Sequence, residues 1–319
     1  MNALIKMLSN SKKFNSYLED IKNKKSPVML TGLTDVSKTY FSYGTSEYIN
    51  NNICIITYNE IQAKRLVKDI SYFNENAVLL PKREIVTYDY VAESKDLPYE
   101  RIEALNKIYE GKAKVIVTTI EALMQRIVPK SVLYKNLLKF NIGKTYNLEE
   151  IKKTLVSLGY IRCDLIEAKG QFSIRGGILD IAITDKKGVR IEFWGDDVDS
   201  IRYFNIASQR STEMIENVTI YPCHEFVLDT NLEDVCKEIE NRYDEEKYEN
   251  IIKNDIELIK SGNYISKIDK YYDSFYKNTT NLLDYIEDNY IIFLDEANKI
   301  KARANNVLVD NQNVQKMLI

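Results

Sequence analysis

Apolar and polar residues alternate along roughly the first 120 positions in blocks that predict strands followed by helices. Short apolar runs between polar residues predict strands, and longer stretches with apolar residues three and four positions apart predict helices. The predicted strands are 28–30, 53–57, 77–81 and 114–119, and the predicted helices are 38–49, 60–73 and 98–111. Repeated strand–helix units predict a parallel sheet covered by helices, which binds ligands beside the carboxyl ends of its strands.

The pattern changes near Pro129. An amphipathic stretch over 148–158 predicts a short helix that ends at Gly159. Beyond it, β-rich runs separated by turn residues predict strands at 172–175, 177–181 and 189–193. We interpret residues 128–222 as an α+β domain inserted into the chain.

The remaining residues predict helices and one more strand. From Asp229 onward, acids and lysines interleave in a pattern typical of a solvated helical face. The apolar run 290–294 predicts a strand. The predicted organisation is therefore residues 1–127 as the first part of a parallel-sheet domain, 128–222 as the insertion, and 223–319 as a helical segment and a strand returning to the first domain.

The composition excludes several classes of function. Of the 319 residues, 45% are hydrophobic and 29% are charged, and the net charge of −3 gives no global basic field to attract nucleic acid. The chain has no apolar run of about 18 residues and no signal-peptide core at its start, so we expect a cytoplasmic protein without a membrane partner. Four well-separated cysteines and one histidine suggest neither a disulfide framework nor a metal site. We expect His224 to be structural or on the surface.

Residues 30–40, LTGLTDVSKTY, resemble a phosphate-binding loop with one position changed. Counted from Gly32, they fit the template G-x-x-x-x-G-K-[ST], except that Ser37 replaces the second glycine. Lys38 and Thr39 are the residues that would contact phosphate and magnesium. Because a Cβ at a loop glycine restricts the backbone and blocks close approach to phosphate, we interpret the loop as degenerate.

Two acids follow the strand predicted at 290–294. In nucleotide-driven motors, acids at the carboxyl end of a neighbouring strand hold magnesium and orient water. Asp295 and Glu296 occupy such a position. If the chain returns to the first sheet, the two acids should lie near Lys38. A strand that simply ends in a polar turn is the alternative.

A second Gly-Lys-Thr sequence, at 143–145, fails on spacing. Leu138 stands five positions before Gly143, where the template requires its first glycine. Asn147 and the acids after it are typical of the N-terminal cap of a helix. We therefore assign no phosphate site there.

Two arginines are candidates for binding a protein partner. Strand alternation over 172–175 places Ser173 and Arg175 on one face, opposite Phe172 and Ile174, and Gly176 follows at a turn. A guanidinium offers rigid paired donors to a partner's carboxylate. Internal ion pairs, from Arg175 to Asp180 or from Arg162 to Glu167, are the alternative.

Four stretches together carry a family resemblance. They are LTGLTDVSKTY at 30–40, DLPYER at 96–101, VIVTTIEALMQR at 115–126 and GYIRCDLIEAKGQFSIRGGILDI at 159–181. Residues from about 25 to 300 resemble the amino-terminal UvrB-homology region of the bacterial transcription-repair coupling factor (Mfd) family. The stretch 159–181 is the most specific, and it is also similar to the UvrA-binding domain of the excision-repair protein UvrB.

The resemblance implies an α/β fold, a degenerate RecA-like (P-loop-type) parallel-sheet domain with an inserted α+β UvrA-binding domain. It implies that Arg162 and Arg175 contact UvrA, with Ser173 where UvrB has a further arginine and Gly176 in the same motif. Two departures from UvrB stand out. Ser37 interrupts the phosphate loop, and residues 87–96 leave no room for UvrB's aromatic DNA-gripping hairpin.

The resemblance implies a module without catalysis that binds UvrA and recruits excision repair to stalled RNA polymerase. No cofactor is expected here. In the parent protein, ATP and magnesium would serve a motor region elsewhere, and contacts with RNA polymerase and DNA would come from the rest of the chain. The alternative hypothesis is an active ATP-dependent helicase or translocase fragment that uses Lys38, Thr39, Asp295 and Glu296.

Overall fold

The structure is a computed structural model that describes residues 3–83, 96–227, 232–242, 249–260, 271–278, 280–286 and 288–318. The chain divides into two units. The first comprises residues 1–84, 103–127 and 280–319, and the second comprises residues 85–102 and 128–279. Helix α5 (Leu97–Tyr109) contains the boundary at residue 102. The two units are described separately below.

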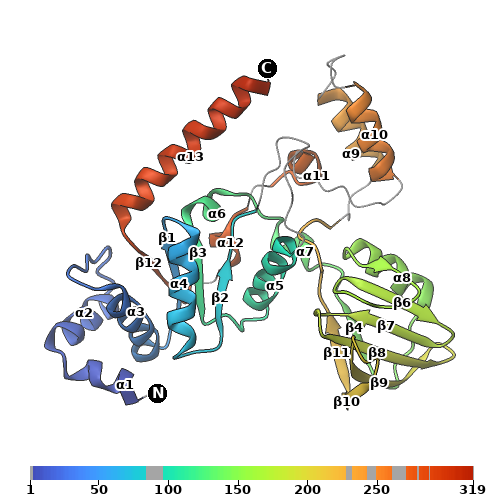
Figure 1. The fold of residues 1–319 in the computed structure, drawn as a ribbon, viewed down its shortest axis with the longest axis horizontal. Coiled ribbons are helices and arrows are strands. Elements are labelled where there is room, and N and C mark those ends of the chain that lie inside the picture. Colours follow the sequence, from blue (N-terminus) through green and yellow to red (C-terminus); the bar gives the residue numbers. More distant parts are fainter. Residues whose placement is uncertain are drawn as a thin grey trace. The chain divides into compact units, whose positions relative to one another are not determined.

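A four-stranded parallel sheet is the centre of the first unit (Figure 1). Its strand order is β12-β1-β3-β2, so the strand from the end of the chain pairs with the first strand. The strands are β1 (Asn52–Thr57), β2 (Ala77–Leu80), β3 (Val115–Thr119) and β12 (Tyr290–Leu294). The predicted return of the chain to the first sheet is confirmed, and β12 forms one edge.

Helices pack on this sheet because its strands are apolar on both faces. On one face Ile53, Ile55 and Val117 pack against Leu66 and Ile70 of helix α4, all at most 3% exposed. The helices and turns of the unit, besides its part of α5, are α1 (Ala3–Lys6), η1 (Met7–Asn10), α2 (Lys12–Lys22), α3 (Asp35–Ile49), α4 (Glu60–Ser71), α6 (Ile120–Met124), α12 (Leu282–Tyr285) and α13 (Ala297–Leu318).

The strand predicted at 28–30 is wrong. These residues form no strand, and β1 already has β12 and β3 as its two neighbours in the sheet. Instead, Val28 and Leu30 pack against the aromatic cluster of α2, while Met29 is 87% exposed. The phosphate-loop segment is therefore not preceded by a strand of the sheet.

A six-stranded sheet forms the centre of the second unit (Figure 1). Its order is β10-β9-β8-β7-β6-β5; the pair β5–β6 is parallel and the other pairs are antiparallel. The strands are β5 (Ile161–Arg162), β6 (Gln171–Arg175), β7 (Ile178–Ala182), β8 (Lys187–Trp194), β9 (Asp197–Asn205) and β10 (Ser211–Met214). The core between this sheet and helix α8 (Leu148–Ser157) includes Phe172, Leu179, Ile191 and Leu155.

The second unit also holds a separate antiparallel pair and further helices. The pair is β4 (Leu138–Asn141) with β11 (Asn217–Ile220). The helices are α7 (Lys130–Leu133), α9 (Leu232–Arg242), α10 (Glu249–Lys260) and α11 (Tyr272–Phe275). We had predicted that residue 223 starts the return to the first domain, but residues 223–279 group with the second unit. The physical reason is that Glu225 forms a buried ion pair with Arg101 and the N–H of Cys223 donates to the Leu158 carbonyl at 2.9 Å. Phe226 in turn contacts Tyr272 and Tyr276.

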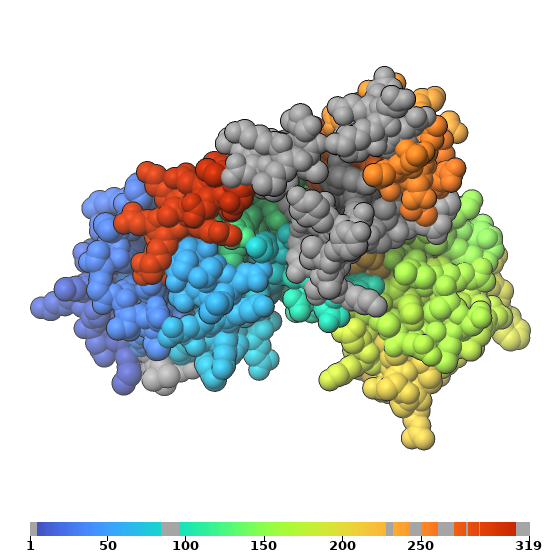
Figure 2. Space-filling model, turned by 45° about the horizontal axis from the view of Figure 1, so that its top comes forward, coloured from blue at the N-terminus to red at the C-terminus, as the bar shows by residue number. Residues whose placement is uncertain are grey.

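The hairpin of β9 and β10 projects from the second unit (Figure 1). Every residue of β10 is exposed. Figure 2 shows this projection in yellow. Within the described part of the chain, no helix is both long and apolar enough to cross a membrane.

We expected His224 to be structural or on the surface, and the structure shows that it is buried. It is 9% exposed, and its ring lies 5.6 Å from that of Tyr99. Burial lowers the pKa of His224 to about 4, so the imidazole is neutral at pH 7.

Candidate functional site

The phosphate-loop segment differs from its template at the backbone. Gly32 adopts a φ of +78°, which glycine accommodates readily. Helix α3 begins at Asp35, so its first turns already contain Ser37 and Lys38. The N–H of Lys38 donates to the Thr34 carbonyl at 2.9 Å, and the N–H of Ser37 donates to the Thr34 hydroxyl at 3.4 Å. The N–H groups that a phosphate loop turns toward its ligand are used inside this helix.

The side chain of Lys38 lies between the two acids that follow β12. Its Nζ donates to Asp295 Oδ1 at 2.8 Å and to Glu296 Oε1 at 2.6 Å. Partial burial alone would lower the pKa of Lys38, but these hydrogen bonds outweigh it and raise the pKa above its ordinary value. Asp295 also accepts from Thr57 Oγ1 at 3.0 Å and Gln62 Nε2 at 3.3 Å. The structure thus brings the two predicted motifs together as an ion-pair network.

Thr39 and Asp35 complete this network. Thr39 is 1% exposed, and its hydroxyl donates to the Asp35 carbonyl at 3.4 Å. The Asp35 carboxylate accepts from Arg65 Nη1 at 2.7 Å and lies 3.7 Å from Lys38 Nζ. A carboxylate in the first turn stabilises a helix and repels phosphate at the same place. The residues present therefore do not match the geometry of a magnesium–nucleotide cradle.

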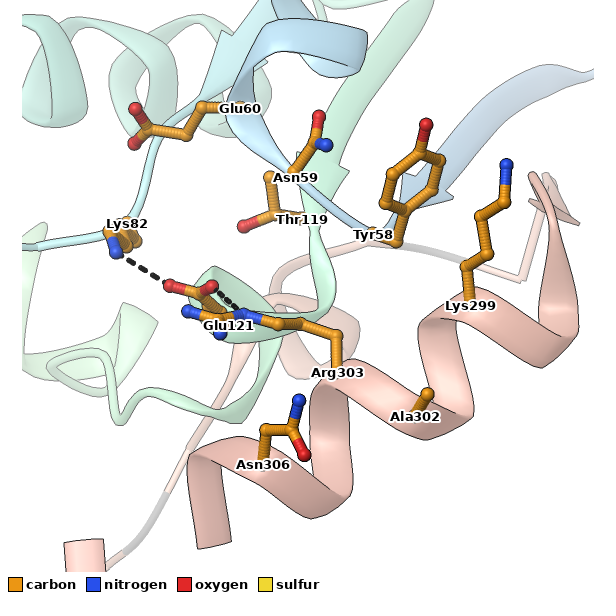
Figure 3. Close-up of a pocket in the computed structure, with 10 residues that line it drawn as sticks. All are labelled: Tyr58, Asn59, Glu60, Lys82, Thr119, Glu121, Lys299, Ala302, Arg303 and Asn306. Carbon is orange, nitrogen blue, oxygen red and sulfur yellow. Dashed lines mark hydrogen bonds and ion pairs between the residues drawn. The ribbon is translucent and has the colours of Figure 1, made fainter. Parts of the chain in front are cut away.

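A cavity of about 520 Å³ lies beside the carboxyl ends of β1 and β3, against α13 (Figure 3). The side chains that line it come from four separate segments. They are Tyr58, Asn59, Glu60, Lys82, Thr119, Glu121, Lys299, Ala302, Arg303 and Asn306. Sequence reasoning missed this cavity, because no local pattern links residues so far apart in the chain.

Glu121 is the central charge of this cavity. It accepts a hydrogen bond from Lys82 Nζ at 2.6 Å and another from Arg303 Nε, as Figure 3 shows. Burial alone would raise the pKa of Glu121, but the hydrogen bonds from Arg303 and Lys82 outweigh it and lower the pKa below its ordinary value. Lys299 Nζ lies 4.9 Å from the centre of the Tyr58 ring. Two of the three cations therefore bind one carboxylate, which ties α13 to α6.

Arg175, at the end of β6 in the second unit, keeps an accessible guanidinium. Its side chain is 56% exposed, and its Nη2 is 3.8 Å from Asp180 Oδ2. Asp180 is already bound by Arg190, whose Nε and Nη2 donate to the two carboxylate oxygens at 2.7 and 2.9 Å. Since this bidentate pair satisfies Asp180, the longer contact leaves Arg175 able to bind an external carboxylate.

Arg162 lies on the adjacent edge strand β5 and is also exposed. The register places it opposite Phe172, whose side chain points into the core under α8, whereas Arg175 lies on the other face. The two arginines therefore share one edge of the sheet but project from its opposite faces. A partner that contacts both must clasp this edge.

Comparison with known proteins gives these residues a context. A family model for the UvrB interaction domain matches residues 138–226, which contain both arginines. The chain is 29% identical over 315 residues to the transcription-repair-coupling factor of Bacillus subtilis (strain 168), and the match covers 94% of this chain and 27% of that protein. This chain is similar to transcription-repair-coupling factors over most of its length.

A second relative agrees. The transcription-repair-coupling factor of Staphylococcus aureus (strain MRSA252) is 26% identical over 296 residues, which cover 89% of this chain and 25% of that protein. The chain spans about a quarter of the length of the curated relatives it matches. The resemblance to the amino-terminal region of these coupling factors is confirmed, as is the α/β fold.

Within the UvrB interaction domain, Ser173 is not placed as we expected. It lies on the same face as Arg175, but it is only 2% exposed, and its hydroxyl donates to the Asp164 carbonyl at 2.8 Å. The segment that follows β5 covers this position. Ser173 therefore supports the chain beside Arg162 and offers no hydroxyl to a partner in this structure.

Gly176 of the same domain occupies the turn between β6 and β7. Its φ of +59° is in the left-handed region, and an added Cβ would have no neighbour within 4 Å. At Gly177 an added Cβ would lie 2.6 Å from the carbonyl oxygen of Phe193. The two glycines therefore let the turn form close to β8 and leave the space beside Arg175 open. We expect no aromatic hairpin near residues 87–96, and residues 87–95 lie outside the described part of the chain.

Proposed function

We propose that this chain is the UvrA-docking module of a transcription-repair-coupling factor. The accessible guanidinium of Arg175, within residues that match the UvrB interaction domain, is the observation that carries the proposal. Asp180, its one acidic neighbour within 4 Å among the described residues, is held by Arg190. Arg162 adds a second exposed guanidinium at the same sheet edge. A partner with carboxylates on both sides of a cleft fits this arrangement.

The test measures retention of this chain on immobilised UvrA. We expect Arg162→Ala and Arg175→Ala each to weaken binding by about tenfold to a hundredfold, since a hydrogen bond to a charged group contributes about 1.5–3 kcal/mol. Arg210→Ala is the matched control, because Arg210 is an exposed arginine of the same unit, outside this edge. Equal binding by wild type and the double variant Arg162→Ala/Arg175→Ala would reject the site.

We also propose that the Gly32–Thr39 segment supports the fold and does not hydrolyse ATP. The bonded N–H groups of the first turn, the buried Thr39 hydroxyl and the two acids on Lys38 support this proposal. Calorimetric titration with magnesium–ATP is the discriminating measurement. Binding abolished by Lys38→Ala would favour the alternative, an active helicase or translocase fragment, and absence of heat at high ligand concentration would remove it.

The wider role follows from the same proposal. Bound to UvrA, the module would bring excision repair to stalled RNA polymerase. Contacts with RNA polymerase and DNA, and any use of ATP and magnesium, would belong to other regions of the parent protein. A parent protein that carries Arg162→Ala and Arg175→Ala should still release stalled polymerase, but it should fail to accelerate repair of the transcribed strand.

A further inference from the structure

Trp194 is the one tryptophan in the chain, and it is 85% exposed. It is the last residue of β8, immediately before the turn at Gly195. The preceding residue, Phe193, is 8% exposed and belongs to the core. Because successive residues of a strand point to opposite faces, the indole lies on the face away from α8. The structure thus places its largest side chain in water at the end of a well-packed strand.

The strand register places Trp194 next to the arginine site. Ile178 is opposite Arg175 on one side and Glu192 on the other. The N–H of Phe193 donates to the Gly177 carbonyl at 2.7 Å, so Trp194 comes level with the glycine turn that follows Arg175. Arg175, Ile178 and Trp194 therefore lie on one face, at one end of the sheet.

This cluster has the composition of a binding hot spot. Ile178 is 38% exposed and the Arg175 side chain is 56% exposed, so a guanidinium adjoins an apolar surface that water covers. Tryptophan and arginine are the residues most enriched among those that dominate interface energies. A single exposed apolar residue needs no explanation. Here Trp194 and Ile178 are exposed together, beside an arginine whose nearest carboxylate is bound by Arg190, and the three side chains form one continuous surface.

We infer that Trp194 is the aromatic anchor of the UvrA-docking face, binding an apolar depression of UvrA beside the carboxylate that receives Arg175. This inference rests on the proposed function and adds a contact that the arginines alone do not provide. The match of residues 138–226 to the UvrB interaction domain favours this occupant over a second copy of the chain.

Substitution at Trp194 gives the first test. We expect Trp194→Ala to weaken binding of this chain to immobilised UvrA at least tenfold, and Trp194→Phe to weaken it less. Met214→Ala is the control, because Met214 is 68% exposed on β10, at the other edge of the sheet, and should leave binding unchanged. Since the Trp194 side chain is exposed, all variants should fold with unchanged circular dichroism.

The outcomes separate the two proposals. Wild-type binding by Trp194→Ala, with loss in Arg175→Ala, would overturn the anchor and leave the docking function intact. No binding of the wild-type chain to UvrA would overturn both. If Trp194→Ala converts a dimer to a monomer in sedimentation without changing UvrA retention, the face joins two copies and the inference fails.

A spectroscopic measurement provides an independent readout. Growth with 5-fluorotryptophan places one fluorine in the chain, because Trp194 is its single tryptophan. We expect one fluorine resonance that shifts or broadens when unlabelled UvrA is added. When the labelled chain also carries Arg162→Ala and Arg175→Ala, the same amount of UvrA should shift or broaden the resonance less. A resonance that stays unchanged at saturating UvrA would refute contact with the indole.

Discussion

Replacement of Lys38 by methionine tests whether this lysine stabilises the first unit or serves a nucleotide. Its Nζ lies 2.8 Å from Asp295 Oδ1 and 2.6 Å from Glu296 Oε1, and its side chain is 21% exposed. The Asp295 side chain is only 5% exposed. Removal of the ammonium group therefore leaves a carboxylate that has little access to water.

The expected loss of stability follows from this burial. Removal of one partner from a buried ion pair costs about 3–5 kcal/mol. Asp295 keeps its hydrogen bonds from Thr57 and Gln62, so we expect the lower end of the range, about 3 kcal/mol. Glu296 is 41% exposed, and the loss of its pair adds at most about 1 kcal/mol.

Amide hydrogen exchange can assign this loss to the correct part of the chain. In Lys38→Met, protection should fall for the amides of β1 and β12, while the amides of β7 and β8 serve as the internal control. Asp295→Asn removes the charge that Lys38 compensates, so the double variant should lose less than the sum of the two single variants. We expect a coupling energy of about 2 kcal/mol from this cycle.

Two results would refute the structural role of Lys38. The first is a coupling energy near zero between positions 38 and 295. The second is amide hydrogen exchange in Lys38→Met at the wild-type rate, together with loss of an ATP turnover that the wild-type chain shows. That result would assign the lysine to nucleotide chemistry.

Three further predictions concern other parts of the fold. Because burial lowers the pKa of His224 to about 4, the unfolded chain binds a proton between about pH 6.5 and 4 that the native chain does not. Stability of the second unit should therefore fall by on the order of 3 kcal/mol as the pH falls through this window, and His224→Phe should flatten the urea-unfolding profile against pH. Gly159→Ala should cost about 2 kcal/mol or more in urea unfolding, since φ is +90° and the new Cβ would lie 2.8 Å from His224 Cδ2; unchanged stability would contradict this geometry. Glu121→Gln should weaken the bonds to Lys82 and Arg303 by about 1 kcal/mol and increase exchange in the first turns of α13, whereas Glu110→Gln should not.

The sequence predicted elements well where burial and local pattern agree. Strands β1, β3 and β8 are rich in β-branched and aromatic residues, and helix α8 follows its Asn147 cap and amphipathic pattern. Strand β9 was not predicted, because Asp197 and Asp199 interrupt its apolar pattern and aspartate is rare in strands. The structure gives this segment a long antiparallel partner in β8, which no local pattern reveals.

Local sequence pattern also failed to show which residues of the candidate sites are buried by tertiary contacts. Alternation correctly put Ser173 and Arg175 on one face, but burial of Ser173 depends on the chain around Asp164, which crosses that face. Apolar residues at 28–30 resembled a strand, but Val28 and Leu30 pack against helix α2 and do not pair with the sheet. Tertiary neighbours decided both positions, and a single sequence does not specify those neighbours.

The late arrival of β12 has a consequence for synthesis on the ribosome. Strand β3 ends at residue 119, but its sheet lacks one strand until residues 290–294 emerge. The six-stranded sheet of the second unit needs no residue beyond 214, so it can assemble while β1 still has an open edge. Until then Lys38 has neither Asp295 nor Glu296 beside it. The nascent first unit therefore exposes an unpaired strand edge for longer than the second, and it is the half of the molecule in greater need of chaperone protection.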